Sequence, residues 1–199
     1  MYSLIQKPAP EFSADCVMPN GEFMKITLSS FRDKKYVCLF FYPLDFTFVC
    51  PSEILAFSHR AKEFESRNVQ LLGVSVDSKF SHFAWRQSPV EQGGIGSIEF
   101  PLVADITKEI SRDYGVLIDD AVALRGTFLI DKSGVIRHAT LNDLPLGRNV
   151  DETLRTIDAL QHTEQYGEVC PAGWSKGQTA MKPTAAGVAN YLKENASRL

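Results

Sequence analysis

Several features are absent from this chain, and each absence narrows its possible roles. The 199 residues contain no C-x-x-C pair and no cysteine or histidine spacing typical of zinc, so no metal site is expected. The longest apolar run, residues 36–44, is far shorter than a membrane span. No charged leader precedes an apolar stretch at the start, which predicts a cytoplasmic location. A net charge of −3 gives no reason to expect nucleic acid or membrane as a partner.

The remaining composition is that of an ordinary globular protein, with 44% hydrophobic and 23% charged residues. The length suits one domain with an extension. After Gly167 the chain becomes rich in proline and glycine around Cys170 and then ends in a polar tail. We therefore predict a domain over residues 1–167 and a C-terminal arm over residues 168–199.

Two apolar strands enclose a helix in the first half of the chain. Residues 36–42 form a continuous apolar run, typical of a parallel strand buried on both faces. Apolar residues then recur at helical spacing from Pro51 to about Arg67, and residues 69–76 predict a second strand. This order makes a βαβ unit, and ligands bind open α/β sheets at the carboxyl ends of such strands.

The second half of the chain continues the alternation of strands and helices. The residues on either side of the Lys132–Gly134 turn predict an antiparallel hairpin. The predicted elements are a helix over 80–87, a strand over 101–105, a helix over 107–114, hairpin strands over 123–131 and 135–140, and a helix over 151–166.

Residues 43–53 are the most informative segment, because they set Cys50 between a buried strand and a helix. Pro51 suits the first helical position, since it lacks the N–H that would go unpaired there. Cys50 would then be the N-cap, facing free backbone N–H groups and the positive end of the helix dipole, which favour a thiolate. The alternative, a buried structural cysteine, is less favoured at this position.

Three other residues could support a thiolate at Cys50. Arg125 lies in an otherwise apolar predicted strand, where a charge should be paired or functional, although an edge arginine facing water is equally consistent. Thr47 offers a hydroxyl that donates and accepts, or is a turn residue. Pro43 could shield the sulfur from water, or simply end the strand.

The spacing Pro-x-x-x-Thr-x-x-Cys formed by Pro43, Thr47 and Cys50 is far more specific than its parts. With it, the chain resembles a typical two-cysteine peroxiredoxin of the alkyl hydroperoxide reductase C and thioredoxin peroxidase group. The resemblance covers nearly the whole chain. The further matching segments are residues 49–53 around the nucleophile, residues 169–171 around a resolving Cys170, Arg125 in Leu-Arg-Gly-Thr-Phe, and the supporting polar pair Glu53 and Arg148.

The resemblance implies a thioredoxin-like α/β fold, with a central mixed sheet flanked by helices, an N-terminal β extension and a C-terminal arm. It also implies reduction of hydrogen peroxide and organic hydroperoxides through a Cys50 sulfenic acid, which Cys170 of a partner subunit resolves as a disulfide. Thioredoxin or a flavin-containing disulfide reductase would restore the thiols. A homodimer, assembled as a pentamer of dimers, and no cofactor are expected, with a role in antioxidant defence.

Other functional classes remain as alternatives. A cysteine hydrolase needs a histidine base near the thiol, and none of the four histidines lies in a recognisable base motif. A disulfide isomerase would need the absent C-x-x-C pair. A holdase chaperone in a high-order assembly is the main alternative function. Cys38 is expected in the core, and Cys16 matches no catalytic position.

Overall fold

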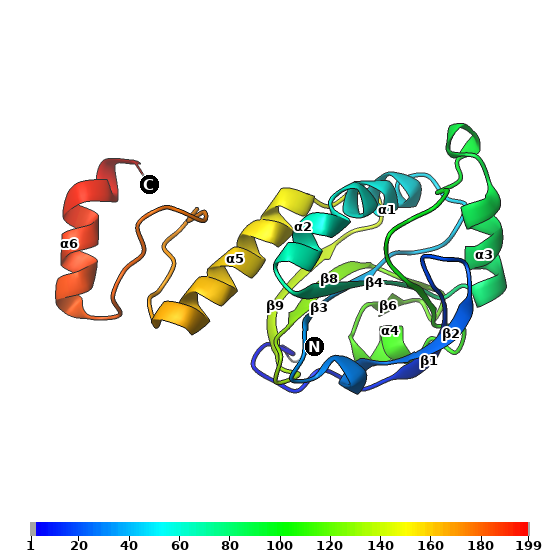
Figure 1. Ribbon diagram of the computed structural model, residues 1–199, viewed down its shortest axis with the longest axis horizontal. Helices are drawn as coiled ribbons and strands as arrows, with labels where there is room; N and C mark the ends of the chain where they lie inside the picture. The colour runs from blue at the N-terminus through cyan, green and yellow to red at the C-terminus, as the bar shows by residue number, and fades with distance from the viewer. Residues whose placement is uncertain (1–2, 199) are drawn as a thin grey trace. The chain divides into compact units, whose positions relative to one another are not determined.

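The computed structural model describes residues 3–198, in which strands and helices alternate (Figure 1). Its contacts divide the chain into two compact units, Met1–Val150 and Asp151–Leu199. The boundary after residue 167 that the sequence suggested stays a prediction.

The first unit is built on a mixed sheet of seven strands in the order β2-β1-β5-β4-β3-β8-β9. Because β1 and β2 form an antiparallel hairpin beside β5, the N-terminal β extension is part of this sheet. The strands are β1 (Ser13–Val17), β2 (Phe23–Thr27), β3 (Tyr36–Phe41), β4 (Val69–Ser75), β5 (Leu102–Ala104), β8 (Arg125–Ile130) and β9 (Ile136–Asn142), and β6 (Leu117–Ile118) pairs with β7 (Val122–Ala123) separately.

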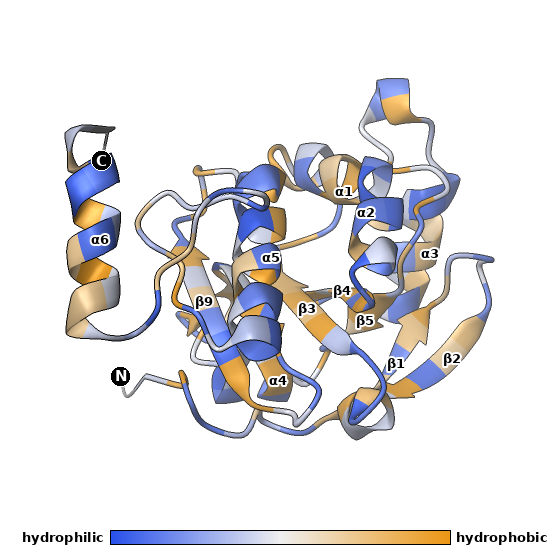
Figure 2. Cartoon of the chain, turned by 60° about the vertical axis from the view of Figure 1, so that its left-hand side comes forward, coloured by the Kyte–Doolittle hydropathy of each residue, from blue (hydrophilic) through white to orange (hydrophobic). Residues whose placement is uncertain are grey.

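Strand β3 lies inside the sheet, parallel to β4 and antiparallel to β8. All six of its residues are buried, and its hydrophobic run is visible as orange ribbon in Figure 2. This is the buried strand that the sequence predicted, and its parallel partner completes the predicted βαβ unit. The hairpin of β8 and β9 is confirmed as well, with an irregularity between Leu129 and Ile130.

The helices of the first unit lie on both faces of the sheet, with α1 and α2 over one face and α4 over the other (Figure 1). The single helix predicted from Pro51 to Arg67 is wrong, because Arg60, with φ −102° and ψ 6°, leaves the helical region and divides it. The helical segments are α1 (Cys50–His59), α2 (Ala61–Ser66), α3 (Lys79–Gln87), α4 (Glu109–Asp113), η1 (Leu28–Phe31) and η2 (Val90–Gln92).

Aromatic packing fixes α1 against the sheet. Phe57 on α1 stacks on Phe40 of β3, with ring centroids 4.3 Å apart and planes 11° from parallel. Phe100 meets Phe40 edge-on at 5.3 Å, and all three rings are buried. Contacts of this kind contribute about 0.5–1.5 kcal/mol beyond the area they bury. The amino end of α1, and with it Cys50, is thereby held at the carboxyl end of β3.

The second unit contains α5 (Val150–Tyr166) from its second residue onward, α6 (Ala185–Asn195) and η3 (Ala196–Arg198). Helix α5 confirms the helix predicted over residues 151–166. Helix α6 was missed, since the sequence indicated only a polar tail; it begins where the Thr184 side chain accepts a hydrogen bond from the Gly187 N–H at 3.0 Å. Over residues 3–198, none of the helices has the length and hydropathy needed to cross a bilayer.

Candidate active site

Cys50 is buried in the first turn of α1. The prediction that it caps the helix is wrong by one position, because Val49 already has helical dihedral angles, φ −84° and ψ −34°. The Val49 carbonyl accepts from the N–H groups of Ser52 and Glu53 at 3.1 and 3.3 Å. The sulfur still lies at the amino end of the helix, where the dipole and the unpaired N–H groups favour negative charge.

Two polar side chains contact the Cys50 sulfur. The Thr47 hydroxyl lies 3.0 Å from Sγ, and Nη1 of Arg125 lies 3.4 Å from it. Both can donate, and a thiolate accepts, so the pair stabilises negative charge on the sulfur. The Thr47 hydroxyl is also 2.8 Å from the Leu44 carbonyl. Its single proton can therefore go to only one of these two acceptors at a time.

Strand register explains how Arg125 reaches Cys50 from 75 positions away. In the antiparallel pairing of β3 with β8, Phe40 faces Thr127, so Arg125 at the start of β8 lies just past the carboxyl end of β3. The arginine is 3% exposed, which excludes the edge arginine facing water that the sequence left open. Its Nε donates to the Leu144 carbonyl at 2.7 Å, which fixes the plane of the guanidinium.

Glu53 and Arg148 complete a buried charge network beside the sulfur. One Glu53 oxygen accepts from Arg125 at 2.6 Å, and Arg148 binds both Glu53 oxygens at 2.8 and 2.9 Å. Burial alone would raise the pKa of Glu53, but the hydrogen bonds and positive charges of Arg148 and Arg125 outweigh burial and lower it. The carboxylate therefore stays ionised and holds both guanidinium groups in place.

The loop between β3 and α1 is buried at its start and packs against α3 at Phe46, although Phe46 and Phe48 are exposed to solvent. Pro43 is buried at its start. Phe46 has a positive φ of 53°, which is unusual for an aromatic residue and has to be held by its surroundings. The Phe46 ring lies 5.9 Å from the ring of Trp85 on α3, which is fully buried. Trp85 in turn donates to the Gly93 carbonyl at 2.8 Å, in the glycine-rich loop over residues 92–97.

Sequence reasoning missed a second set of residues that contacts this loop. The Asp45 carboxylate is buried and accepts from Tyr42, Ser81 and His82, as described further below. The available signal was a histidine within a predicted helix, between Ser81 and Phe83. A lone histidine in such a place gives no indication of its partner.

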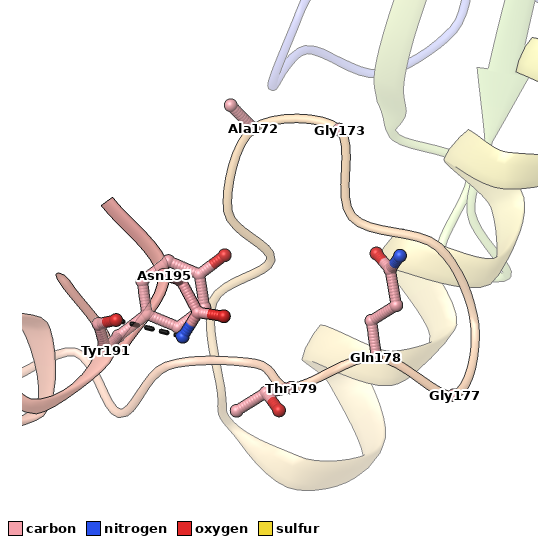
Figure 3. Close-up of a pocket in the computed structure, with 7 residues that line it drawn as sticks. All are labelled: Ala172, Gly173, Gly177, Gln178, Thr179, Tyr191 and Asn195. Carbon is pink, nitrogen blue, oxygen red and sulfur yellow. Dashed lines mark hydrogen bonds between the residues drawn. The ribbon is translucent and has the colours of Figure 1, made fainter. Parts of the chain in front are cut away.

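Cys170 belongs to the second unit, where it is partly exposed. Its sulfur lies 3.6 Å from the Ala159 carbonyl of α5 and 3.9 Å from the Thr163 hydroxyl. The loop that follows is tied to α5, since Arg155 donates to the Trp174 carbonyl at 2.8 Å. Within this unit an open hollow of about 550 Å³ is lined by the same loop and by α6, including Ala172 and Tyr191 (Figure 3).

The other two cysteines are fully buried in the first unit. Burial raises the pKa of Cys16 to about 11 and that of Cys38 to about 12. Both stay protonated near neutral pH and are poor nucleophiles. Across residues 3–198, no group of three or more His, Cys, Asp or Glu side chains could hold a metal ion.

Comparison with known proteins decides the family. The model of the AhpC/TSA family matches residues 5–139. The chain belongs to this family. A second model, the C-terminal domain of 1-Cys peroxiredoxin, matches residues 159–194.

Individual relatives agree with this assignment. This peroxiredoxin is 58% identical to alkyl hydroperoxide reductase C of Helicobacter pylori, over 98% of this chain and all of that one. It is 52% identical to peroxiredoxin-1 of Gallus gallus, over 96% of each. The reduced crystal structure of Plasmodium vivax 2-Cys peroxiredoxin superposes with a TM-score of 0.96 at 54% identity, covering 96% of this chain and all of that one. The thioredoxin-like fold and a thiol-dependent peroxidase activity follow.

Proposed function

We propose that Cys50 is the peroxidatic nucleophile of this peroxidase and that hydrogen peroxide and organic hydroperoxides are its substrates. The observation that supports this most directly is the sulfur at the amino end of α1, with Thr47 at 3.0 Å and Arg125 at 3.4 Å. Burial instead raises the pKa of Cys16 and Cys38, so these two thiols are poorer candidates for the nucleophile.

The chemistry is a two-electron transfer at sulfur. The Cys50 thiolate attacks one peroxide oxygen, the O–O bond breaks, and the leaving oxygen takes up a proton as water or alcohol while Cys50 becomes a sulfenic acid. Arg125 and Thr47 would hold the peroxide oxygens and stabilise the charge that develops on them. Glu53 and Arg148 act indirectly, by fixing Arg125, and the buried Pro43 keeps water from the sulfur.

The second half of the cycle is assigned to Cys170. Its thiol would condense with the sulfenic acid of a partner subunit, forming a disulfide and releasing water. A dithiol reductant, either thioredoxin or a flavin-containing disulfide reductase, would then return both cysteines to thiols. This scheme requires a homodimer, and we propose a pentamer of dimers located in the cytoplasm, with a role in antioxidant defence. The comparisons do not favour a holdase chaperone as the main role.

Peroxide consumption with a small dithiol as reductant tests this proposal. The unmodified protein should remove hydrogen peroxide, and a Cys50→Ser variant should lose that activity. Cys38→Ala is the matched control, since it also removes a buried thiol but is expected to keep the activity. Activity that persists in Cys50→Ser, or that disappears in Cys38→Ala with the fold intact, would contradict the assignment of Cys50.

A further inference from the structure

Behind the loop that carries Thr47 lies a polar cluster formed by the buried residues Tyr42, Asp45 and His82 and the partly buried Ser81. The Asp45 side chain accepts from the Tyr42 hydroxyl at 2.9 Å, from the Ser81 hydroxyl at 2.8 Å and from Nδ1 of His82 at 2.9 Å. His82 is completely buried and the Asp45 side chain is 1% exposed. None of these four side chains contacts the Cys50 sulfur, so the reaction scheme above leaves them without a role.

Both ring nitrogens of His82 face oxygen atoms of neighbouring elements. Nε2 lies 3.2 Å from the Val103 carbonyl, which can only accept, and Nδ1 faces the Asp45 carboxylate, which also accepts. Each ring nitrogen therefore lies against an oxygen acceptor, and the ring bridges the Asp45 carboxylate to the backbone of β5. Burial and the neighbouring Asp45 charge raise the pKa of Tyr42 well above its usual value, so its hydroxyl remains protonated and can donate.

The cluster holds Asp45 on both its side chain and its backbone. The Asp45 N–H donates to Asp77 at 2.9 Å, and Asp77 in turn accepts from the Ser75 hydroxyl at 2.7 Å. The next residue, Phe46, keeps its positive φ while its ring lies against Trp85 of α3. The turn from Leu44 to Thr47 is thus fixed by α3 and β4, at a conformation that an aromatic residue rarely adopts unaided.

This turn determines where the Thr47 proton goes. The Leu44 carbonyl precedes Asp45 directly and accepts from the Thr47 hydroxyl at 2.8 Å. While that carbonyl is held in place, the Thr47 oxygen keeps lone pairs that can accept a hydrogen bond from a hydroperoxide O–H. If the turn relaxed, the hydroxyl would rotate to donate to the Cys50 sulfur, 3.0 Å away, and its lone pairs would no longer face the hydroperoxide.

We propose that His82, through Asp45 and the Leu44 carbonyl, is a positioning residue that sets the orientation of the Thr47 hydroxyl for attack on the peroxide. This inference rests on the peroxidase assignment of Cys50. It predicts that loss of the His82–Asp45 pair impairs the reaction with peroxide far more than the general reactivity of the Cys50 thiolate, since only peroxide uses Thr47.

The test compares two reactions of Cys50 in chains that also carry Cys170→Ser, so that the sulfenic acid persists. Quenched-flow trapping with dimedone and mass spectrometry gives the rate with hydrogen peroxide, and alkylation by iodoacetamide gives thiolate reactivity. His82→Gln, which removes the ring that bridges the two acceptors, should slow the peroxide reaction by about 10- to 100-fold. Alkylation should change by less than about twofold, because it needs only the thiolate.

A double-mutant cycle separates positioning from general loosening of the fold. In a Thr47→Val background, His82→Gln should slow the peroxide reaction by less than about twofold further, because its effect passes through the missing hydroxyl. Equal losses with and without Thr47, or an equal loss in alkylation, would overturn the proposal. Ser78→Ala is the matched control, since it removes the N-cap hydrogen bond of α3 to Ser81 N–H without touching Asp45, and it should leave the peroxide rate unchanged.

A milder variant covers the case in which His82→Gln does not fold. Tyr42→Phe deletes one donor to Asp45 and keeps the ring, and a smaller loss with the same dependence on Thr47 is expected. An unaltered peroxide rate in folded His82→Gln, or in Tyr42→Phe if His82→Gln does not fold, would refute this inference and leave the peroxidase assignment standing. If the parent chain reacts with peroxide no faster than a free thiol, the peroxidase assignment itself fails.

Discussion

At the scale of single residues, the site depends on one buried carboxylate between two arginines. Glu53 contacts Arg125 and Arg148, and all three side chains are at most 4% exposed. The partners satisfy one another, and Arg148 also donates to the carbonyls of Phe41 and Gly126 at 2.8 and 3.0 Å. A buried charge that loses its partner is far more costly than the intact pair is stabilising. Both the fold and the Cys50 environment therefore depend on Glu53.

Replacing Glu53 with glutamine should reduce the free energy of unfolding by about 3–5 kcal/mol at neutral pH, because two guanidinium groups lose their counter-charge in the interior. Chemical denaturation of both chains, followed by circular dichroism, measures the difference. A change below about 1 kcal/mol would indicate that water or another group compensates.

The pH dependence of stability gives an independent test of the same residue. The pKa of Glu53 is lower in the folded chain than its usual 4.5, so the folded protein binds this proton more weakly than the unfolded chain does. The resulting stabilisation is fully present above pH 4.5 and is lost as the pH falls toward the folded pKa. Glu53→Gln should flatten this acid limb of the stability curve, and an unchanged limb would contradict the prediction.

The sequence predicted the residues that contact the Cys50 sulfur, but it did not predict the contact between Asp45 and His82. Cys50, Thr47 and Arg125 could be named because a thiol at a helix start and a charge in an apolar strand are unusual locally. The contact between Asp45 and His82 joins positions 37 residues apart and has no local pattern. Only the placement of α3 beside the loop brings these two side chains together.

At the scale of elements, close packing between neighbouring strands supports the site. Gly73 of β4 pairs with Phe40 of β3 and Leu102 of β5. A methyl group built on Gly73 would lie 3.0 Å from Leu102, 3.1 Å from Phe40 and 3.3 Å from Phe100. Glycine is therefore required at position 73, because the neighbouring side chains leave no space for a methyl group.

Gly73→Ala should destabilise the fold by about 1–3 kcal/mol, because the aromatic pair that seats α1 would have to shift. Thermal unfolding measures the loss. Gly167→Ala serves for comparison, because no atom lies within 4 Å of the added methyl there and any loss would come from its positive φ of 66°. Equal stability of Gly73→Ala and the parent would show that the core can relax around an added methyl group.

Sequence periodicity predicted most elements and missed two details for physical reasons. The break at Arg60 was hidden because the apolar spacing continues through it, while the backbone changes direction where Arg60 pairs with Glu63. Helix α6 was missed because the proline- and glycine-rich segment before it indicated an arm, and none of its residues is buried within the described chain. Its start was readable from Thr184, a favourable N-cap.

At the scale of the whole molecule, the two cysteines proposed for the cycle lie in different compact units, Cys50 in the first and Cys170 in the second. A division of this kind suits two separate steps, oxidation at one sulfur and resolution by the other. Cys170→Ser should therefore lose repeated turnover with dithiol reductants of the thioredoxin type and accumulate Cys50 oxidised to sulfinic acid. Mass spectrometry during turnover detects it, and undiminished turnover with thioredoxin would contradict the role of Cys170.

The central claim is that Cys50 is a nucleophile for peroxide, resolved by Cys170 of a second chain. Single-turnover reaction of the reduced protein with hydrogen peroxide, followed by a non-reducing gel and peptide mass mapping, tests it most directly. The account predicts a fast reaction and a dimer-sized band that links Cys50 to Cys170. An intrachain disulfide would contradict the proposed pairing between subunits, and a Cys50 that reacts no faster than a free thiol would contradict the claim as a whole.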